Sequence, residues 1–259
     1  MTRLAHLYER NPLRVLFPTP IAGDVPVAVL VTTSGGLVAG DRVAIAVEVG
    51  AGAAAHVTGS AAEKIYRSTG ATTVVDQAMT AGAGAWLEFL PPETILFDRA
   101  KLRRVTRVDL QGGGGFLGGG IIVFGRLAMG ERFCAGLLHE GWEVSRDGAL
   151  IWGDALHVED DVAAIMDHPA CFAGAEACAT LVFAPQGGNP QPFVEAARAI
   201  QESCAAAGLR AGVTAVNELL VARWLGDAIK LRRSYAELAC HLRAAAMGLP
   251  ARLPRLWHI

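Results

Sequence analysis

Charged residues are scarce in this chain of 259 residues: Asp, Glu, Lys and Arg make up 19% of it, and the formal net charge is -2. This near balance argues against nucleic acid as the main partner, because nucleic-acid-binding proteins carry a clear basic excess. The low charge fraction indicates large surfaces buried against protein partners. A Gly/Ala-rich β protein with no such surface, consistent with the 30 glycines, is the alternative.

Long apolar runs are missing too. No run approaches the roughly 20 consecutive apolar residues of a membrane span, and the nearest, 112–125, is half glycine and stops at Arg126. The first residues contain no apolar core of a secretion signal. The five cysteines are odd in number and scattered, as expected of reduced thiols. We therefore expect a cytoplasmic protein outside any membrane.

Catalytic motifs and clustered metal ligands are also lacking. The chain has no G-x-S-x-G elbow, no P-loop and no H-E-x-x-H motif. The glycines at 112–115 and 118–120 lead into the strand pattern of 121–124, whereas a phosphate-binding loop opens a helix. His168, Cys171 and Cys178 fall short of a four-ligand zinc set and are interpreted as including buried thiols. We predict no enzymatic activity and no tightly bound cofactor or metal ion.

What the chain does have is a series of short strand patterns. Apolar residues alternate with Ala44, Ala46 and Glu48 over 43–49, which is typical of a half-buried strand. Similar patterns follow at 72–80, 86–89, 94–97, 102–110, 116–124, 132–138, 142–145 and 150–156, with a tight hairpin turn at 146–148. No long helical pattern intervenes, so an all-β sandwich, barrel or solenoid is favoured.

The pattern changes after about residue 185. Pro192 and Gly208 mark the start and end of one helix. Residues 234–237 form a capping-box sequence that starts a second helix, closed by Gly248. Residues 213–224 fit either a strand or a helix. We predict one domain over 1–259, mainly β over 1–184 and mixed, with two short helices, over 185–259.

Basic residues cluster from Arg99 to Arg107. On a strand, Lys101, Arg103 and Arg107 share one face and Arg104 lies on the other. Such a strand could be an edge strand whose charges discourage aggregation, or it could dock an acidic partner.

Six carboxylates lie beside apolar or glycine-rich segments. Charges near a core are normally paired, and basic neighbours such as Arg42 and Arg99 are available for pairing. A structural ion-pair network and a polar passage through the protein both remain open. The six residues are Asp41, Glu63, Glu88, Glu93, Asp98 and Glu131.

Two motifs carry a family resemblance. GGLVAGDR at 35–42 and AAEKIYRS at 61–68 resemble the signature of UreD, also called UreH, usually seen as GGLVGGD and AATKFYRS. Further segments similar to UreD sequences follow in the same order at 86–98, 125–133, 221–226 and 254–257. The resemblance therefore covers nearly the whole chain.

The resemblance implies an elongated, β-helix-like all-β body with a small C-terminal helical portion. It also implies a urease accessory protein that binds UreF, and through it the GTPase UreG, and that docks on apo-urease. Nickel is expected to pass transiently through an internal polar tunnel of the UreD protein to the urease active site. A UreD protein catalyses nothing itself.

Carried over to this sequence, the six carboxylates become candidates for the nickel route, with Asp41 the strongest. Candidate interface or structural residues are Lys64, Tyr66, Arg67 and Arg126. Two positions depart from the family pattern: Ala39 replaces a usual glycine, and Gly120 stands where members commonly carry Glu or Asp. A stand-alone β-sandwich module that binds a ligand such as a carbohydrate is the alternative, although the chain has only 5 Trp and 3 Tyr to form aromatic platforms.

Overall fold

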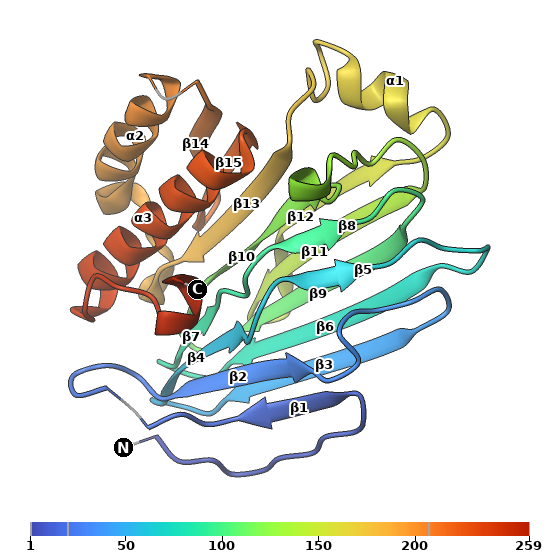
Figure 1. The fold of residues 1–259 in the computed structure, drawn as a ribbon. Helices are drawn as coiled ribbons and strands as arrows, with labels where there is room; N and C mark the ends of the chain where they lie inside the picture. The colour runs from blue at the N-terminus through green and yellow to red at the C-terminus, as the bar shows by residue number, and fades with distance from the viewer. Residues whose placement is uncertain (1, 20, 207, 259) are drawn as a thin grey trace.

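The computed structural model describes residues 2–19, 21–206 and 208–258, whose strands form two sheets (Figure 1). The wide sheet has ten strands: β1 (Leu13–Leu16), β2 (Val27–Thr32), β4 (Ala54–Gly59), β5 (Glu63–Ile65), β7 (Trp86–Phe89), β8 (Thr94–Leu96), β10 (Gly115–Phe124), β13 (Ala177–Ala184), β14 (Arg210–Val216) and β15 (Leu219–Gly226). The narrow sheet has five: β3 (Arg42–Val49), β6 (Thr73–Ala81), β9 (Lys101–Leu110), β11 (Leu137–Arg146) and β12 (Ala149–Val158). The predicted class, dominated by β-structure, is confirmed.

The body is β-solenoid-like, because the chain moves back and forth between the two sheets as it advances. β2, β4, β7 and β10 pair in parallel in the wide sheet, and β3, β6, β9 and β11 do so in the narrow sheet. Hydrogen bonds join residues one coil apart, 32 positions for Thr58 and Leu90 and 29 for Thr106 and Gln77. This parallel pairing of strands one coil apart is typical of a solenoid, and it decides against the sandwich and the barrel that the strand pattern had left open.

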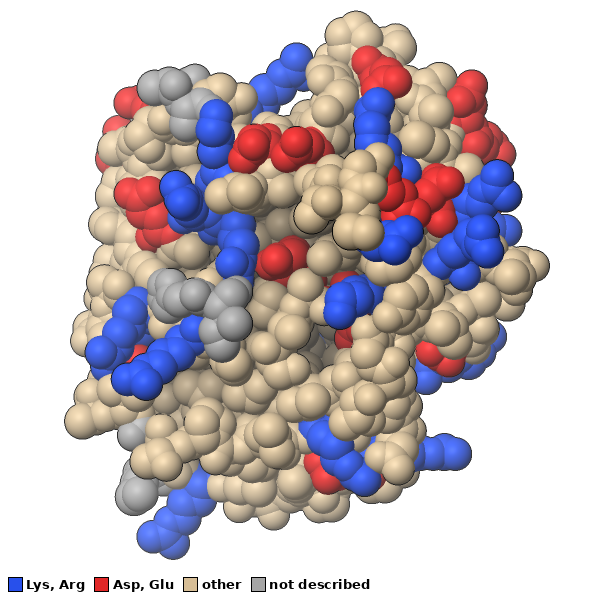
Figure 2. Space-filling model, in the orientation of Figure 1, with Lys and Arg blue, Asp and Glu red and all other residues tan. Residues whose placement is uncertain are grey.

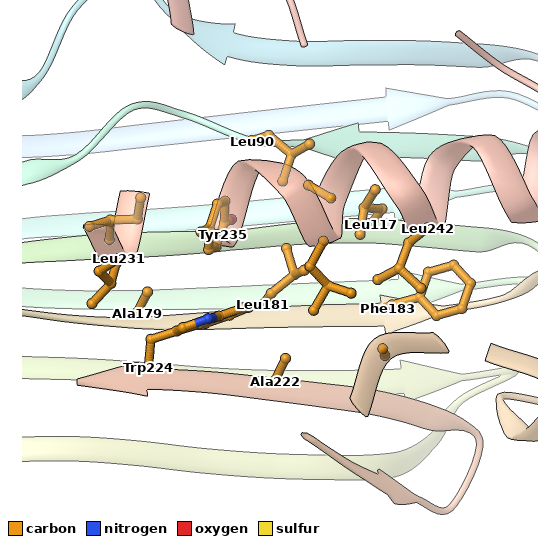
Figure 3. Close-up of a cluster of buried hydrophobic side chains, with 14 of the residues drawn as sticks. Leu90, Leu117, Ala179, Leu181, Phe183, Ala222, Trp224, Leu231, Tyr235 and Leu242 are labelled. Atoms are coloured by element: carbon orange, nitrogen blue, oxygen red, sulfur yellow. The ribbon is translucent and has the colours of Figure 1, made fainter. Parts of the chain in front are cut away.

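Three helices complete the fold: α1 (Val162–Asp167), α2 (Gln191–Ala206) and α3 (Ala228–Met247). Single 3-10 turns lie at Leu127–Met129, Gln186–Gly188 and Arg255–His258. α2 and α3 cover one face of the wide sheet, where a cluster including Leu117, Leu181, Trp224 and Tyr235 is buried (Figure 3). The narrow sheet covers the other face. The wide sheet therefore separates two hydrophobic cores, one beneath the helices and one between the two sheets.

The C-terminal part corrects one predicted helix start. α3 begins at Ala228, where the side chain of Asp227 accepts a hydrogen bond from the N–H of Lys230, and it ends at Gly248 in a left-handed conformation. Ser234, predicted to cap the helix, lies inside it, and its hydroxyl bonds buried Trp224 and Cys204. Residues 213–224, ambiguous in sequence, belong to the β14–β15 hairpin.

Two strand predictions need correction as well. Residues 132–136 form a loop and not a strand, because two of its N–H groups donate to the carboxylate of Asp98 instead of to a neighbouring strand. β9 lies between β6 and β11, so its basic residues are not explained by an edge position. Their outward and inward faces are as predicted: Arg103 and Arg107 are exposed and Arg104 is buried. The turn at 147–148 is confirmed.

Two other sequence expectations can be compared with the described part of the chain. Cys171 is exposed, so the prediction of a buried thiol is wrong for this residue, while Cys178 is half-buried. Within that part, no helix is long and apolar enough to cross a membrane.

Candidate functional site

A layer of polar side chains crosses the space between the two sheets. It separates two apolar clusters: along β6, Gln77 lies between Val75 of one cluster and Met79 of the other. Along β11, Glu140 likewise lies between Leu138 and Trp142. We call this set the polar layer; its members are Thr32, Glu63, Gln77, Thr94, Arg104, Thr106 and Glu140.

Part of the polar layer opens into a cavity of about 160 Å³ between β2, β5 and β8 of the wide sheet and β3, β6 and β9 of the narrow sheet. Thr32, Glu63, Gln77, Thr94 and Arg104 line it together with apolar side chains. Figure 2 shows a hollow between the places that β2 and β5 occupy in Figure 1. A polar cavity of this size has room for several water molecules or a hydrated ion.

Glu63 supplies the carboxylate of the cavity. It is the first residue of β5 and accepts a hydrogen bond from the Thr32 hydroxyl. Burial raises the pKa of Glu63, although Thr32 and the positive charges of Arg104 and Lys64 oppose that change. A carboxylate whose charge is disfavoured by burial gains from a cation that enters beside it.

Arg104 lines the cavity and joins it to the rest of the polar layer. Its Nε atom donates to both oxygens of Glu140, at 3.0 and 2.8 Å, and its Nη1 atom donates to Thr94 at 2.8 Å. Burial raises the pKa of Glu140, with Arg104 acting in the opposite direction. A guanidinium stays protonated in proteins, so a cation that crosses the polar layer must pass a fixed positive charge balanced by Glu140.

The space beyond Arg104 is also accessible. Gly120 is the only half-buried residue of β10, whose other residues are buried, and Thr180 and Cys178 on neighbouring β13 are half-buried. A Cβ atom added at Gly120 would lie 3.5 Å from the Nη2 atom of Arg104. The room that Gly120 leaves therefore faces the guanidinium from the side opposite the cavity.

The polar residues continue toward the far edge of the two sheets. Thr180 pairs in register with Arg223 of β15. The Arg223 side chain donates to the Asp154 carboxylate of β12 at 2.6 Å, and both are partly exposed. Polar groups thus extend from the cavity to an exposed ion pair between the sheets.

Comparison with known proteins identifies the family. The family model described as UreD urease accessory protein matches residues 1–258. The chain belongs to the UreD family. It is 44% identical to a urease accessory protein UreD from Magnetococcus marinus, over all of this chain and 89% of that protein. It is 40% identical to urease accessory protein UreD 3 from a Bradyrhizobium species, over 99% of this chain and 88% of the relative.

The two UreD motifs lie side by side. Leu37 of the first forms a bridge with Ile65 of the second, and the Leu37 N–H donates to the Lys64 carbonyl. A Cβ atom at Gly36, whose φ is 152°, would lie 2.7 Å from that carbonyl oxygen, so only glycine permits this approach. Ala39 is absent from the described residues with positive φ, and it fits its place in the motif.

Asp41 has a local role in the first motif. One of its carboxylate oxygens accepts a hydrogen bond from the N–H of Val38 at 2.8 Å, which closes the glycine turn. Asp41 is not among the described residues that line the cavity. Its participation in a nickel route stays a prediction.

The second motif contains Glu63 and three candidate interface or structural residues. Tyr66 packs edge-to-face on Phe97, with ring centroids 4.9 Å apart, and its hydroxyl donates to the Gly35 carbonyl. It thereby ties the second motif to the first. Lys64 and Arg67 are exposed, where a partner could reach them.

Three other predicted carboxylates lie in local contacts outside the cavity. Glu93 forms an ion pair of 3.1 Å with Arg232 of α3. Asp98 accepts N–H groups of the 132–136 loop. Glu131 pairs with Arg126, which lowers the pKa of Glu131 and sits 4.5 Å over the Phe97 ring. The geometry gives each of them a stabilising partner.

Glu88 lies on the opposite face of the wide sheet from the polar layer. Its carboxylate is fully buried and contacts Nδ1 of His56 at 2.6 Å, Nε1 of Trp86 at 3.0 Å and Nε of Arg243 at 3.0 Å. Burial alone would raise its pKa, but hydrogen bonding and charge from His56, with Arg243, lower it to about 2. Arg243 also donates to Asp24 at 2.6 Å. We call these five residues the Glu88 network.

The sequence did not single out most of the polar layer. Gln77, Thr94 and Glu140 were not recognised, because isolated polar residues in strands are ordinary. Arg104 gave a usable signal, since the alternation of β9 placed it opposite its basic neighbours, on the face that carries Leu102 and Val108. The sequence does not reveal that these strands align their inward-facing polar residues in one layer between the two sheets.

Proposed function

We propose that this chain is a non-catalytic scaffold of urease maturation that conducts nickel to the urease active site through the polar layer. In this proposal it binds UreF, through UreF the GTPase UreG, and apo-urease, and it acts in the cytoplasm. Nickel is cargo that passes through and is not retained. Family membership supports the accessory role and does not favour a stand-alone ligand-binding module.

The observation that carries the proposal is the course of the polar layer. Oxygen donors from β2, β5, β6 and β8 face a cavity whose one carboxylate, that of Glu63, gains from a cation. Carboxylate and hydroxyl oxygens with water bind a divalent ion loosely, which suits transfer better than storage. Arg104 and Glu140 then control the step between the cavity and the space beside Gly120.

The experiment compares cells that carry the urease operon with and without this gene. We expect loss of both urease activity and urease-bound nickel without the gene, and recovery when the gene is supplied. Nickel-loaded, active urease in its absence would refute the accessory role in that host.

Variants then test the route. Glu63→Ala and Glu140→Ala should each lower the nickel content of urease while UreF and urease still copurify with the variant. Glu195→Gln, which alters an exposed ion pair on α2 outside the polar layer, is the matched control and should leave nickel content unchanged. Asp41→Ala tests whether the glycine motif also belongs to the route. Normal loading by both Glu63→Ala and Glu140→Ala would exclude the polar layer as the path.

A further inference from the structure

Two histidines form a cross-strand pair on the outer face of the narrow sheet. His139 of β11 and His157 of β12 are directly opposite each other in an antiparallel register. Their Nδ1 atoms are 3.4 Å apart and their rings are inclined at 63°. Glu140, the next residue of β11, points between the sheets to Arg104, so the two histidines lie outside the polar layer.

The separation of the two nitrogens fits a shared metal ion. A zinc-like ion holds imidazole nitrogens at about 2.0–2.1 Å, and two such ligands at a tetrahedral angle lie about 3.4 Å apart. The distance between the two Nδ1 atoms therefore matches the distance between two imidazole ligands of one ion, and ring rotation can direct both nitrogens at it. The antiparallel ladder holds the two Cα atoms in place, because β11 and β12 pair without interruption from Leu138 and Val158 to Val144 and Trp152.

A neighbouring carboxylate favours the ring tautomer that metal binding needs. The Nε2 atom of His157 lies 3.4 Å from a carboxylate oxygen of Glu159, which favours a proton on Nε2 and leaves Nδ1 free as a ligand. Arg103, in register with His139 on β9, repels cations and limits the affinity.

We propose that His139 and His157 form a two-imidazole site for a late first-row divalent cation such as Ni²⁺, Zn²⁺ or Cu²⁺. Imidazole suits these ions, whereas Mg²⁺ prefers oxygen ligands. Water fills the remaining positions, since no group of three or more His, Cys, Asp or Glu ligands gathers among the described residues. The proposal is independent of the nickel route, because it concerns the outer face of the sheet.

Calorimetric titration of the purified full chain, without a polyhistidine tag, tests the site with NiCl₂ and ZnCl₂. We expect His139→Ala and His157→Ala each to abolish one binding equivalent or weaken it at least tenfold. His168→Ala removes an exposed histidine that follows α1, away from the two strands, and is the matched control; it should bind like the parent. MgCl₂ should give no heat of binding at this site.

A spectroscopic measurement separates ligation from an indirect effect on folding. One equivalent of Cu²⁺ should show hyperfine coupling to two imidazole nitrogens in the parent and to one in His157→Gln, whose thermal unfolding should match that of the parent. Unchanged binding and unchanged spectra in the His139 and His157 variants would overturn the proposal and leave the pair as a hydrogen-bonded contact between two strands.

Discussion

The wide sheet carries a buried carboxylate on each face, and the cost of burying the negative charge is compensated differently on the two faces. On the helix side, Glu88 is surrounded by donors and a cation, and its pKa is lowered. On the other side, Glu63 has one hydroxyl partner and a cavity, and its pKa is raised. The first arrangement stabilises the fold. The second leaves a charge partly uncompensated, which is what the proposed passage of nickel requires.

The largest expected effect on stability is in the Glu88 network, on the helix side of the wide sheet. Arg243→Ala removes the cation from the Glu88 network and leaves the buried carboxylate with only His56 and Trp86 as partners, which should lower the free energy of unfolding by about 3–5 kcal/mol. Urea unfolding measures it. Arg198→Ala breaks an exposed ion pair with Glu195 and should change the value by less than about 0.5 kcal/mol. Similar values for the two variants would mean that the network is not structural.

Acid should weaken the same network. The pKa of Glu88 falls from an ordinary 4.5 to about 2 on folding, so its contribution to stability is complete above about pH 4.5 and is lost as pH falls toward 2. Glu88→Gln should flatten this part of the stability curve, by on the order of 1 kcal/mol between pH 5.5 and 3.5. Unfolding at pH 5.5 and 3.5 for parent and variant checks this. An equal slope in both would contradict the assignment.

Two adjacent glycines of β10 allow a direct comparison of the two faces of the wide sheet. A Cβ atom at Gly119, on the helix side, would lie 2.2 Å from the Thr180 carbonyl oxygen and 2.6 Å from the Tyr235 hydroxyl. Gly119→Ala should therefore cost about 1–3 kcal/mol through overpacking. Gly120→Ala meets only Arg104 at 3.5 Å and should stay within about 0.5 kcal/mol of the parent. Thermal unfolding of both variants decides; equal losses would mean that neither face is open.

The smallest effect is expected at Glu63. Glu63→Gln keeps an acceptor for Thr32 and removes a charge that burial disfavours, so stability at pH 7 should change by less than about 1 kcal/mol, toward higher stability. The raised pKa means that the contribution of Glu63 is present below its ordinary pKa and is lost as pH rises through the folded value. This sign is opposite to that of Glu88. Unfolding at pH 4 and 7 measures it, and a loss of stability at pH 7 would show that Glu63 is paired.

The strands could be predicted from the sequence because apolar residues alternate in them, as Val43, Ile45, Val47 and Val49 do in β3. The start of α3 could not be predicted from its capping box, because Ser234 bonds Trp224 and Cys204 across the core. Asp227 had the chemistry of an N-cap as well. Local sequence offered two starts, and tertiary contacts selected one.

The candidate site was harder to predict for a topological reason. Glu63 and Glu88 both lie beside apolar residues, and the sequence gave no sign that they face opposite sides of the same sheet. That difference depends on the strands with which they pair: β5 pairs with β8, whereas β7 pairs with β4. The partners of Glu88 come from positions as distant as Arg243, which is 155 residues away. No short-range pattern contains such information.

Arg243 also has a consequence for the order of events during synthesis. Its guanidinium joins Asp24, Glu88 and the carbonyls of Pro250 and Arg252, so it connects the segment before β2 to the segment after α3. While the ribosome is still making α3, Glu88 and Asp24 have emerged and lack this cation. The helix-side core can therefore close only after Arg243 has left the ribosome, and a nascent chain that stops before residue 243 leaves that face of the wide sheet uncovered.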